Sequence, residues 1–270
     1  LTFCRIGKTT ALQRQMIGGT SNSIGMAIAP LVISYLIFHG TPLHDIVTKQ
    51  FIIPLIILIL IMLIITLLVG KTQMPSIDNV RQAPGEKFDK SVWSFRNLKL
   101  GVWGIFFYVG IEVAVGANVN MYASELGGSF ASNATHMAAL YWGLLLLGRF
   151  LGSFIKQVPS EKQLVIASIG AIVLLVLAML TANPWILTLI GFFHSIMWPA
   201  IFTLATDQLG KYTTKASGVL TMGVIGGGII PLLQGIFADV MGGNWLWTWL
   251  LVIAGEAYIL YYGLNGYKQH

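Results

Sequence analysis

The sequence predicts an all-α membrane protein with eight transmembrane helices, and two observations support this fold class. Of its 270 residues, 56% are hydrophobic and 10% are charged, and the mean hydropathy is +0.77. A soluble domain carries about 25% charged residues. The apolar residues form runs long enough for a helix to cross a bilayer, which takes about 20 residues. They do not alternate with polar residues as the strands of a membrane barrel do. The lipid bilayer is therefore the first predicted partner.

Eight apolar segments follow one another along the chain. The clearest is 51–69, which contains no charged residue. Helices are the expected conformation because the hydrocarbon core cannot satisfy an open backbone. The predicted spans are 16–38, 51–69, 98–121, 137–155, 164–181, 184–206, 216–237 and 246–264.

The basic residues orient these spans. With eight crossings, all of the 16 Lys and Arg residues except Lys49 fall on one side of the bilayer. The positive-inside rule places that side in the cytoplasm, together with both termini. Arg149 is assigned to it by its nearest helix end. The net charge of +6 is thus a topology signal spread over short loops, and no nucleic-acid partner is expected. A single Cys4 provides no thiolate metal cage.

The longest polar stretch, 71–97, divides two spans from six, and Pro75, Pro84 and Gly85 interrupt any helix there. We interpret it as a central cytoplasmic loop between two bundles. The predicted domains are the remainder of an amino-terminal bundle (1–70), this loop (71–97) and a complete six-helix carboxy-terminal bundle (98–270).

A short motif occurs twice, as Ile24–Leu31 and as Ile225–Leu232, with five of its eight positions identical. The copies lie on the first and seventh spans, so an even number of crossings gives them the same direction. Parallel duplication of six-helix halves is the architecture of the major facilitator fold. The second copy lies on the fifth helix of its half. The first copy should do so too, which predicts an amino-terminally truncated fragment lacking about four helices, roughly 130 residues.

Four phrases carry a family resemblance: Tyr108–Gly116, Tyr141–Gly152, Ser195–Thr203 and Gly226–Pro231. With them the chain resembles the fucose–galactose–glucose:proton symporters of the major facilitator superfamily. The resemblance implies a monomeric sugar transporter of the bacterial inner membrane that works by alternating access. It implies a proton as the coupling ion, no cofactor and no enzymatic activity. The protonatable acids of the best-understood members lie on the first and fourth helices, which this chain is expected to lack.

Two residues are the first candidates for the transport path. Glu112 stands near the middle of its span, where a charge costs about 2.5–3.5 kcal/mol, so it must be neutral, paired or beside a wet cavity. The alternative is a buried structural acid. Asn22 matches an Asn that family members use in the central cavity, and its amide offers sugar hydroxyls a donor and an acceptor. The alternative is a hydrogen bond between helices.

Three further residues are candidate substrate contacts. His194 and Trp198 are four apart on one predicted span and should share a face. The Trp would pack against a sugar ring and the His would bond its hydroxyls. The alternatives are a His bonded inside the bundle and a Trp in the lipid belt. Asn118 is a candidate for the outer part of the cavity.

The candidate gating residues are Arg149, Asp207, Pro199 and Pro231. Arg149, with Lys156 and Lys162, resembles the basic cytoplasmic loop motif of the superfamily, and Asp207 is a possible partner for it. Pro199 should bend its span, and Pro231 lies in the second repeat copy. Glu256 stands in an apolar run and receives no role.

Other functions stay open at this point. They are transport of another neutral solute or a drug by the same fold, and an inactive fragment. A membrane enzyme would need clustered acids or histidines, which the sequence does not show. No Lys or Arg is expected near the middle of the membrane, which favours a neutral substrate. No metal site is predicted.

Overall fold

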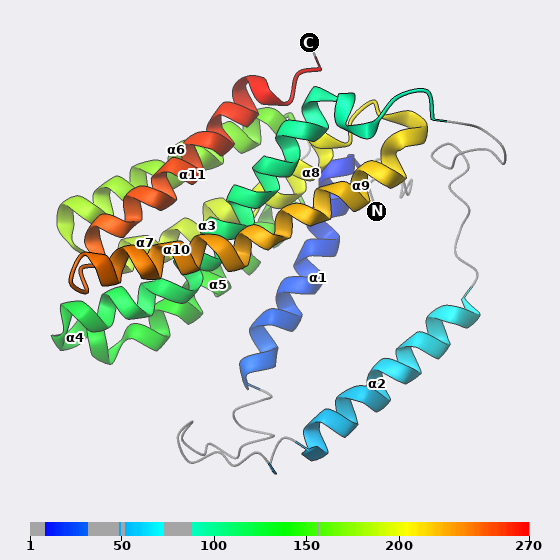
Figure 1. Cartoon of the computed structure of the whole chain (residues 1–270). Helices are drawn as coiled ribbons and strands as arrows, with labels where there is room; N and C mark the ends of the chain where they lie inside the picture. The colour runs from blue at the N-terminus through cyan, green and yellow to red at the C-terminus, as the bar shows by residue number, and fades with distance from the viewer. Residues whose placement is uncertain (1–8, 32–48, 50–51, 73–87, 156, 270) are drawn as a thin grey trace.

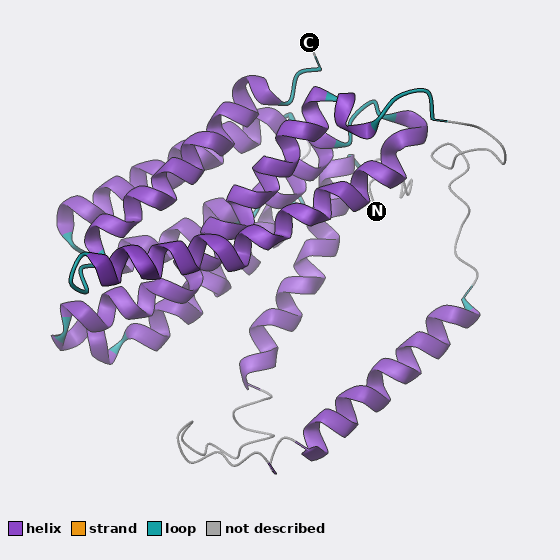
Figure 2. Ribbon diagram, viewed as in Figure 1, coloured by secondary structure: helices purple, strands orange, loops and turns teal. Residues whose placement is uncertain are grey.

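The computed structural model describes residues 9–31, 49, 52–72, 88–155 and 157–269. All regular elements in these ranges are helical (Figure 2). The long helices are α1 (Ala11–Leu31), α2 (Ile52–Lys71), α3 (Arg96–Leu126), α5 (Ala134–Gly152), α6 (Ser160–Thr181), α7 (Pro184–His194), α8 (Met197–Ala205), α9 (Thr213–Thr221), α10 (Gly226–Val240) and α11 (Trp249–Tyr261). The shorter elements are η5 (Val92–Ser94), α4 (Gly128–Ser132), η6 (Gly210–Tyr212), η7 (Met222–Ile225), η8 (Leu246–Thr248) and η9 (Tyr262–Gly266).

Each predicted span overlaps one of these helices or a series of shorter ones, as far as its residues are described. Five helical segments of the described chain are long and apolar enough to cross a membrane by themselves: Ile52–Lys71, Arg96–Leu126, Ser160–Thr181, Pro184–Ala205 and Gly210–Val240. The protein is therefore an integral membrane protein. Most of the predicted central loop, 73–87, lies outside the described residues, as does the end of the first predicted span.

Helix α3 runs through the centre of the bundle formed by α3 to α11 (Figure 1). It packs against α10, α8, α11, α5 and α7. Close approach depends on glycines. A side chain at Gly226 would meet the backbone of Phe106, and one at Gly110 would meet Ile230. Small residues at helix contacts are the usual way in which membrane helices pack, because lipid supplies no hydrophobic drive for their association.

The first two helices differ in how they meet this bundle. Helix α1 packs against α5 and α8, and Met16 on it is fully buried. Helix α2 lies apart (Figure 1) and buries none of its side chains against the rest of the described chain. An all-round apolar helix of this kind is suited to a lipid environment or to further apolar partners.

The sixth predicted span, 184–206, is not one continuous helix. Helix α7 ends at His194 and α8 begins at Met197, with a turn between them. The cause is Pro199, which has no N–H to donate to the carbonyl four residues earlier, that of Ser195. The predicted bend is confirmed, and it leaves a backbone acceptor in the interior of the bundle.

Candidate functional site

A cavity of about 500 Å³ lies between α1 and the bundle, where α3, α5, α8 and η7 face it. Glycines and apolar side chains form part of its wall. Four polar side chains and two indole rings also line it: Gln15, Asn22, Glu112, Arg149, Trp142 and Trp198.

An ion pair forms part of this wall. The Arg149 Nη2 atom lies 3.3 Å from Glu112 Oε1, and the two side chains are 8% and 12% exposed. Arg149 is close to the carboxy-terminal end of α5, but helical side chains point back toward the amino-terminal end. The guanidinium therefore reaches the middle part of α3, where Glu112 lies. The pair offsets two charges that would each be costly in an apolar interior.

The remaining donors of Arg149 are also used. Its Nη1 donates to Ser23 Oγ on α1 at 2.7 Å, and its Nη2 also lies 3.4 Å from Tyr108 Oη. Its Nε donates at 3.3 Å to the carbonyl of Ser195, the acceptor that Pro199 leaves free. The guanidinium thus joins α1 to three helices of the bundle. Protonation of Glu112, or loss of its bond to Arg149, would therefore affect the contact between α1 and the α3–α11 bundle.

This arrangement overturns two sequence-based interpretations. We interpreted Asp207 as a possible partner of Arg149, but Arg149 pairs with Glu112, and the Asp207 carboxylate lies 3.5 Å from Gln208 Nε2. The expectation that no cation lies near the middle of the membrane was wrong as well. It placed Arg149 by its position in the chain and ignored the length and direction of its side chain.

Five of the predicted residues lie together at the cavity: Asn22, Glu112, Arg149, Trp198 and Pro199. The other predicted residues lie elsewhere. Asn118 is buried and donates to Gln234 Oε1 at 2.9 Å. Pro231 lies inside α10, and neither it nor Asp207 is among the cavity-lining residues.

His194 is fully buried and does not line the cavity. The prediction that it shares a face with Trp198 required an unbroken helix between them, and the turn after α7 removes that condition. Its ring nitrogens bond Tyr141 and Glu256 instead. Glu256, for which the sequence suggested no role, is therefore the partner of a buried histidine.

Sequence reasoning missed Gln15, Trp142, Ser23 and Tyr108 as parts of this site. Trp142 and Tyr108 belong to phrases that carry the family resemblance, and Ser23 lies one residue from Asn22. A search for the acceptor freed by Pro199 would have indicated the neighbourhood of Ser195.

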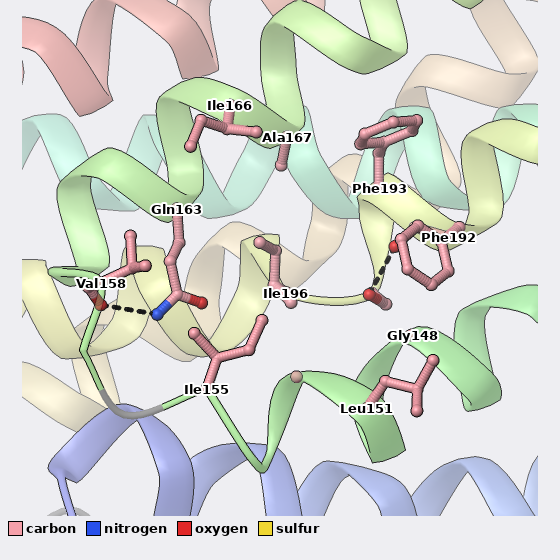
Figure 3. A pocket seen from close by; sticks show the side chains of 12 residues that line it. Gly148, Leu151, Ile155, Val158, Gln163, Ile166, Ala167, Phe192, Phe193 and Ile196 are labelled. Carbon is pink, nitrogen blue, oxygen red and sulfur yellow. Dashed lines mark hydrogen bonds between the residues drawn. The ribbon is translucent and has the colours of Figure 1, made fainter.

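A second cavity, of about 200 Å³, lies between α5, α6 and α7 (Figure 3). Its wall is nearly all hydrocarbon, including Leu151, Ile166 and Phe193. The polar side chains drawn there are already engaged, because Gln163 Nε2 donates to the Val158 carbonyl at 2.7 Å and Ser195 Oγ to the Phe192 carbonyl at 2.6 Å. It offers a sugar hydroxyl little to bond. Among the described residues no group of three or more His, Cys, Asp or Glu side chains is placed to hold a metal ion.

An apolar helical bundle with a polar cavity between it and a further helix is an arrangement suited to a membrane transporter. Residues 14–231 match the Major Facilitator Superfamily. The chain belongs to this superfamily of transporters.

Two curated relatives have similar sequences. A putative glucose/galactose transporter of Helicobacter pylori (strain J99) is 35% identical over 263 residues, which cover 92% of this chain and 64% of that protein. A glucose/galactose transporter of Brucella abortus (strain 2308) is 33% identical over 268 residues, or 96% of this chain and 65% of that protein. The chain thus spans slightly under two thirds of the length of these relatives.

A solved structure has a similar fold. The crystal structure of the major facilitator transporter FucP in the outward conformation superposes with a TM-score of 0.77 at 23% identity, covering 95% of this chain and 68% of that one. This confirms the predicted all-helical major facilitator fold.

Proposed function

We propose that the chain takes part in secondary active transport of a monosaccharide of the glucose, galactose or fucose type. Transport would proceed by alternating access and be coupled to protons, with no further cofactor. The names of the two curated relatives support the substrate class. The topology that goes with this proposal is eight transmembrane helices, both termini in the cytoplasm, and a monomer in the bacterial inner membrane.

The observation that carries the proposal is the chemistry of the cavity. Gln15 and Asn22 present amide groups, which donate and accept hydrogen bonds as sugar hydroxyls require. Trp142 and Trp198 present ring surface for the C–H faces of a pyranose. The charge of Arg149 is offset by Glu112 at 3.3 Å, so the site as a whole favours a neutral ligand. A neutral substrate is therefore still expected. The reason is now the pairing of Arg149 with Glu112, and no longer the absence of a cation from the middle of the membrane.

The cavity also suits alternating access. Its wall contains α1 on one side and the α3–α11 bundle on the other, and Arg149 bonds Ser23 across this boundary. A ligand that competes for Glu112 or Arg149 would weaken that cross-boundary bond. The guanidinium of Arg149 thereby links ligand binding to movement of α1 relative to the α3–α11 bundle.

Uptake measurements test the proposal. Cells that lack their own uptake of these sugars would express the complete reading frame that contains this sequence and receive radiolabelled D-glucose, D-galactose or L-fucose, since the 270 residues alone are not expected to transport. We expect saturable uptake of at least one sugar, and loss of this uptake when an uncoupler collapses the proton gradient. N22A should reduce it, whereas S21A, which changes an exposed neighbour on the same helix, should not.

Other outcomes would distinguish the alternatives. Uptake of a different neutral solute or drug, with no competition by sugars, would keep the transporter class and replace the substrate. Complete inactivity of a chain that is folded in the membrane would indicate that these residues do not suffice for transport.

A further inference from the structure

A chain of short contacts runs through the bundle behind the cavity. His194 Nε2 lies 2.6 Å from Glu256 Oε1, and His194 Nδ1 lies 2.6 Å from Tyr141 Oη. The same Tyr141 oxygen lies 3.0 Å from the backbone carbonyl oxygen of Glu112. The side chains of Tyr141, His194 and Glu256 are 0% exposed. Four helices, α11, α7, α5 and α3, are connected in this order.

The number of protons in this chain follows from its geometry. A carbonyl oxygen only accepts, and Tyr141 Oη donates its proton to the Glu112 carbonyl oxygen at 3.0 Å. With that proton engaged, the 2.6 Å contact to His194 requires a hydrogen on Nδ1. The contact from Nε2 to Glu256 needs one further hydrogen, on either the ring or the carboxyl group.

The charges around His194 and Glu256 favour the same number of protons on the pair. Glu112 and Arg149 on the cavity side offset each other at 3.3 Å. Tyr108 of α3 places its ring edge-on to His194, with centroids 6.2 Å apart. Helix α8 has no titratable residue, and those of α6, Glu161 and Lys162, lie in its first turn. An ionised Glu256 beside a neutral His194 would thus be an uncompensated buried charge, which is costly.

We infer that His194 and Glu256 share one proton in addition to the hydrogen of a neutral imidazole. The pair is then either imidazolium with carboxylate or imidazole with carboxylic acid. The pair is a protonation site in the carboxy-terminal bundle, separate from the cavity. In water at pH 7.5 a free His and a free Glu together hold almost no proton. Loss of the bound proton would turn the Tyr141 hydroxyl from the Glu112 carbonyl to His194 Nδ1, so its presence is communicated to the cavity wall. This inference does not rest on the proposed sugar transport.

The position of the proton can be observed directly. The other four histidines, His39, His44, His136 and His270, would be changed to Gln, which leaves His194 as the only imidazole. In ¹⁵N-histidine-labelled protein reconstituted in lipid at pH 7.5, the nitrogen shifts distinguish protonated from bare ring nitrogens. We expect a protonated Nδ1. A bare Nδ1 with a protonated Nε2 would overturn the inference.

E256Q provides a second test that needs no substrate. A Gln amide can donate to His194 Nε2, so this variant keeps every contact of the chain without the extra proton. Above about pH 7.5, wherever the folded parent keeps this proton and the unfolded chain has lost it, stability falls as pH rises, by at most tenfold in the unfolding constant per pH unit. In E256Q this dependence is absent.

Unfolding curves of both proteins in the same detergent from pH 7.5 to 9.5 would show the difference. We expect the transition of the parent to move down relative to that of E256Q as pH increases. Parallel curves would contradict a retained proton, whatever the uptake experiments show.

Discussion

Two buried acid–base pairs lie on opposite sides of Tyr141, and they differ in their access to the cavity. Glu112 and Arg149 line the cavity and are 12% and 8% exposed, whereas Glu256 and His194 are both fully buried. The first pair uses an arginine, which is charged at any physiological pH, and the second uses a histidine, whose two ring nitrogens can each carry or lack a proton. The first is therefore suited to contact with a ligand, and the second to holding a proton.

The comparison also explains why the two pairs are connected. Tyr141 Oη contacts the Glu112 backbone on one side and the His194 ring on the other. A sealed pair without such a connection would contribute only to the fold. Through Tyr141, two hydrogen bonds connect the protonation state of the buried pair to the backbone of α3 at the cavity.

The largest expected effect comes from R149A, which leaves Glu112 buried without its partner. Breaking one side of a buried pair costs about 3–5 kcal/mol in the free energy of unfolding. Sugar uptake should be lost as well, since the bond from α1 to the bundle disappears. Thermal unfolding in detergent and uptake in cells would measure the two effects.

Two controls sharpen this prediction. K162A removes an exposed lysine of α6 and should change stability by less than about 0.5 kcal/mol. The double variant E112Q/R149M removes both charges and should recover part of the lost stability, because no unpaired charge remains. Equal losses in the single and double variants would mean that Glu112 does not depend on Arg149.

The second prediction separates the two pairs by removing their connection. Y141F deletes the hydroxyl that contacts both Glu112 and His194. A hydrogen bond between membrane helices contributes on average about 0.6 and at most about 1.7 kcal/mol, so the loss of unfolding free energy should lie in this range. Y267F is a matched control, because Tyr267 is half-buried and lies outside the contacts of Tyr141. A loss as large as that of R149A would contradict the view of Tyr141 as a connection only.

The sequence predicted the spans well because crossing a bilayer imposes length and apolarity on each helix separately. The segment 51–69 is an example, since α2 occupies Ile52–Lys71. These properties are local and need no knowledge of neighbours. Glu112 was also predictable as a functional candidate, because a carboxylate in such a segment needs a partner wherever that partner comes from.

Partners were harder to predict because they depend on side-chain direction and on breaks within helices. Arg149 was assigned to a cytoplasmic end although its guanidinium reaches Glu112. The shared face predicted for His194 and Trp198 failed at the turn before Pro199, and Glu256 had no visible partner until α11 was packed into the bundle against α3 and α6. Two of these errors concern contacts between segments and one concerns a break within a segment, and periodicity along one segment encodes neither.

The smallest change in stability is expected for P199A, which tests why Arg149 is held where it is. Alanine restores an N–H that can donate to the Ser195 carbonyl, in competition with Arg149 Nε. The gained helix bond and the weakened arginine contact should nearly cancel, with a net change in unfolding free energy of about 1 kcal/mol or less. Uptake should nevertheless fall, because the guanidinium loses one of the acceptors that orient it toward Glu112.

P184A, at the first residue of α7 where proline fits the helix, is the matched control. Unchanged uptake in P199A would show that Ser23, Tyr108 and Glu112 suffice to position Arg149.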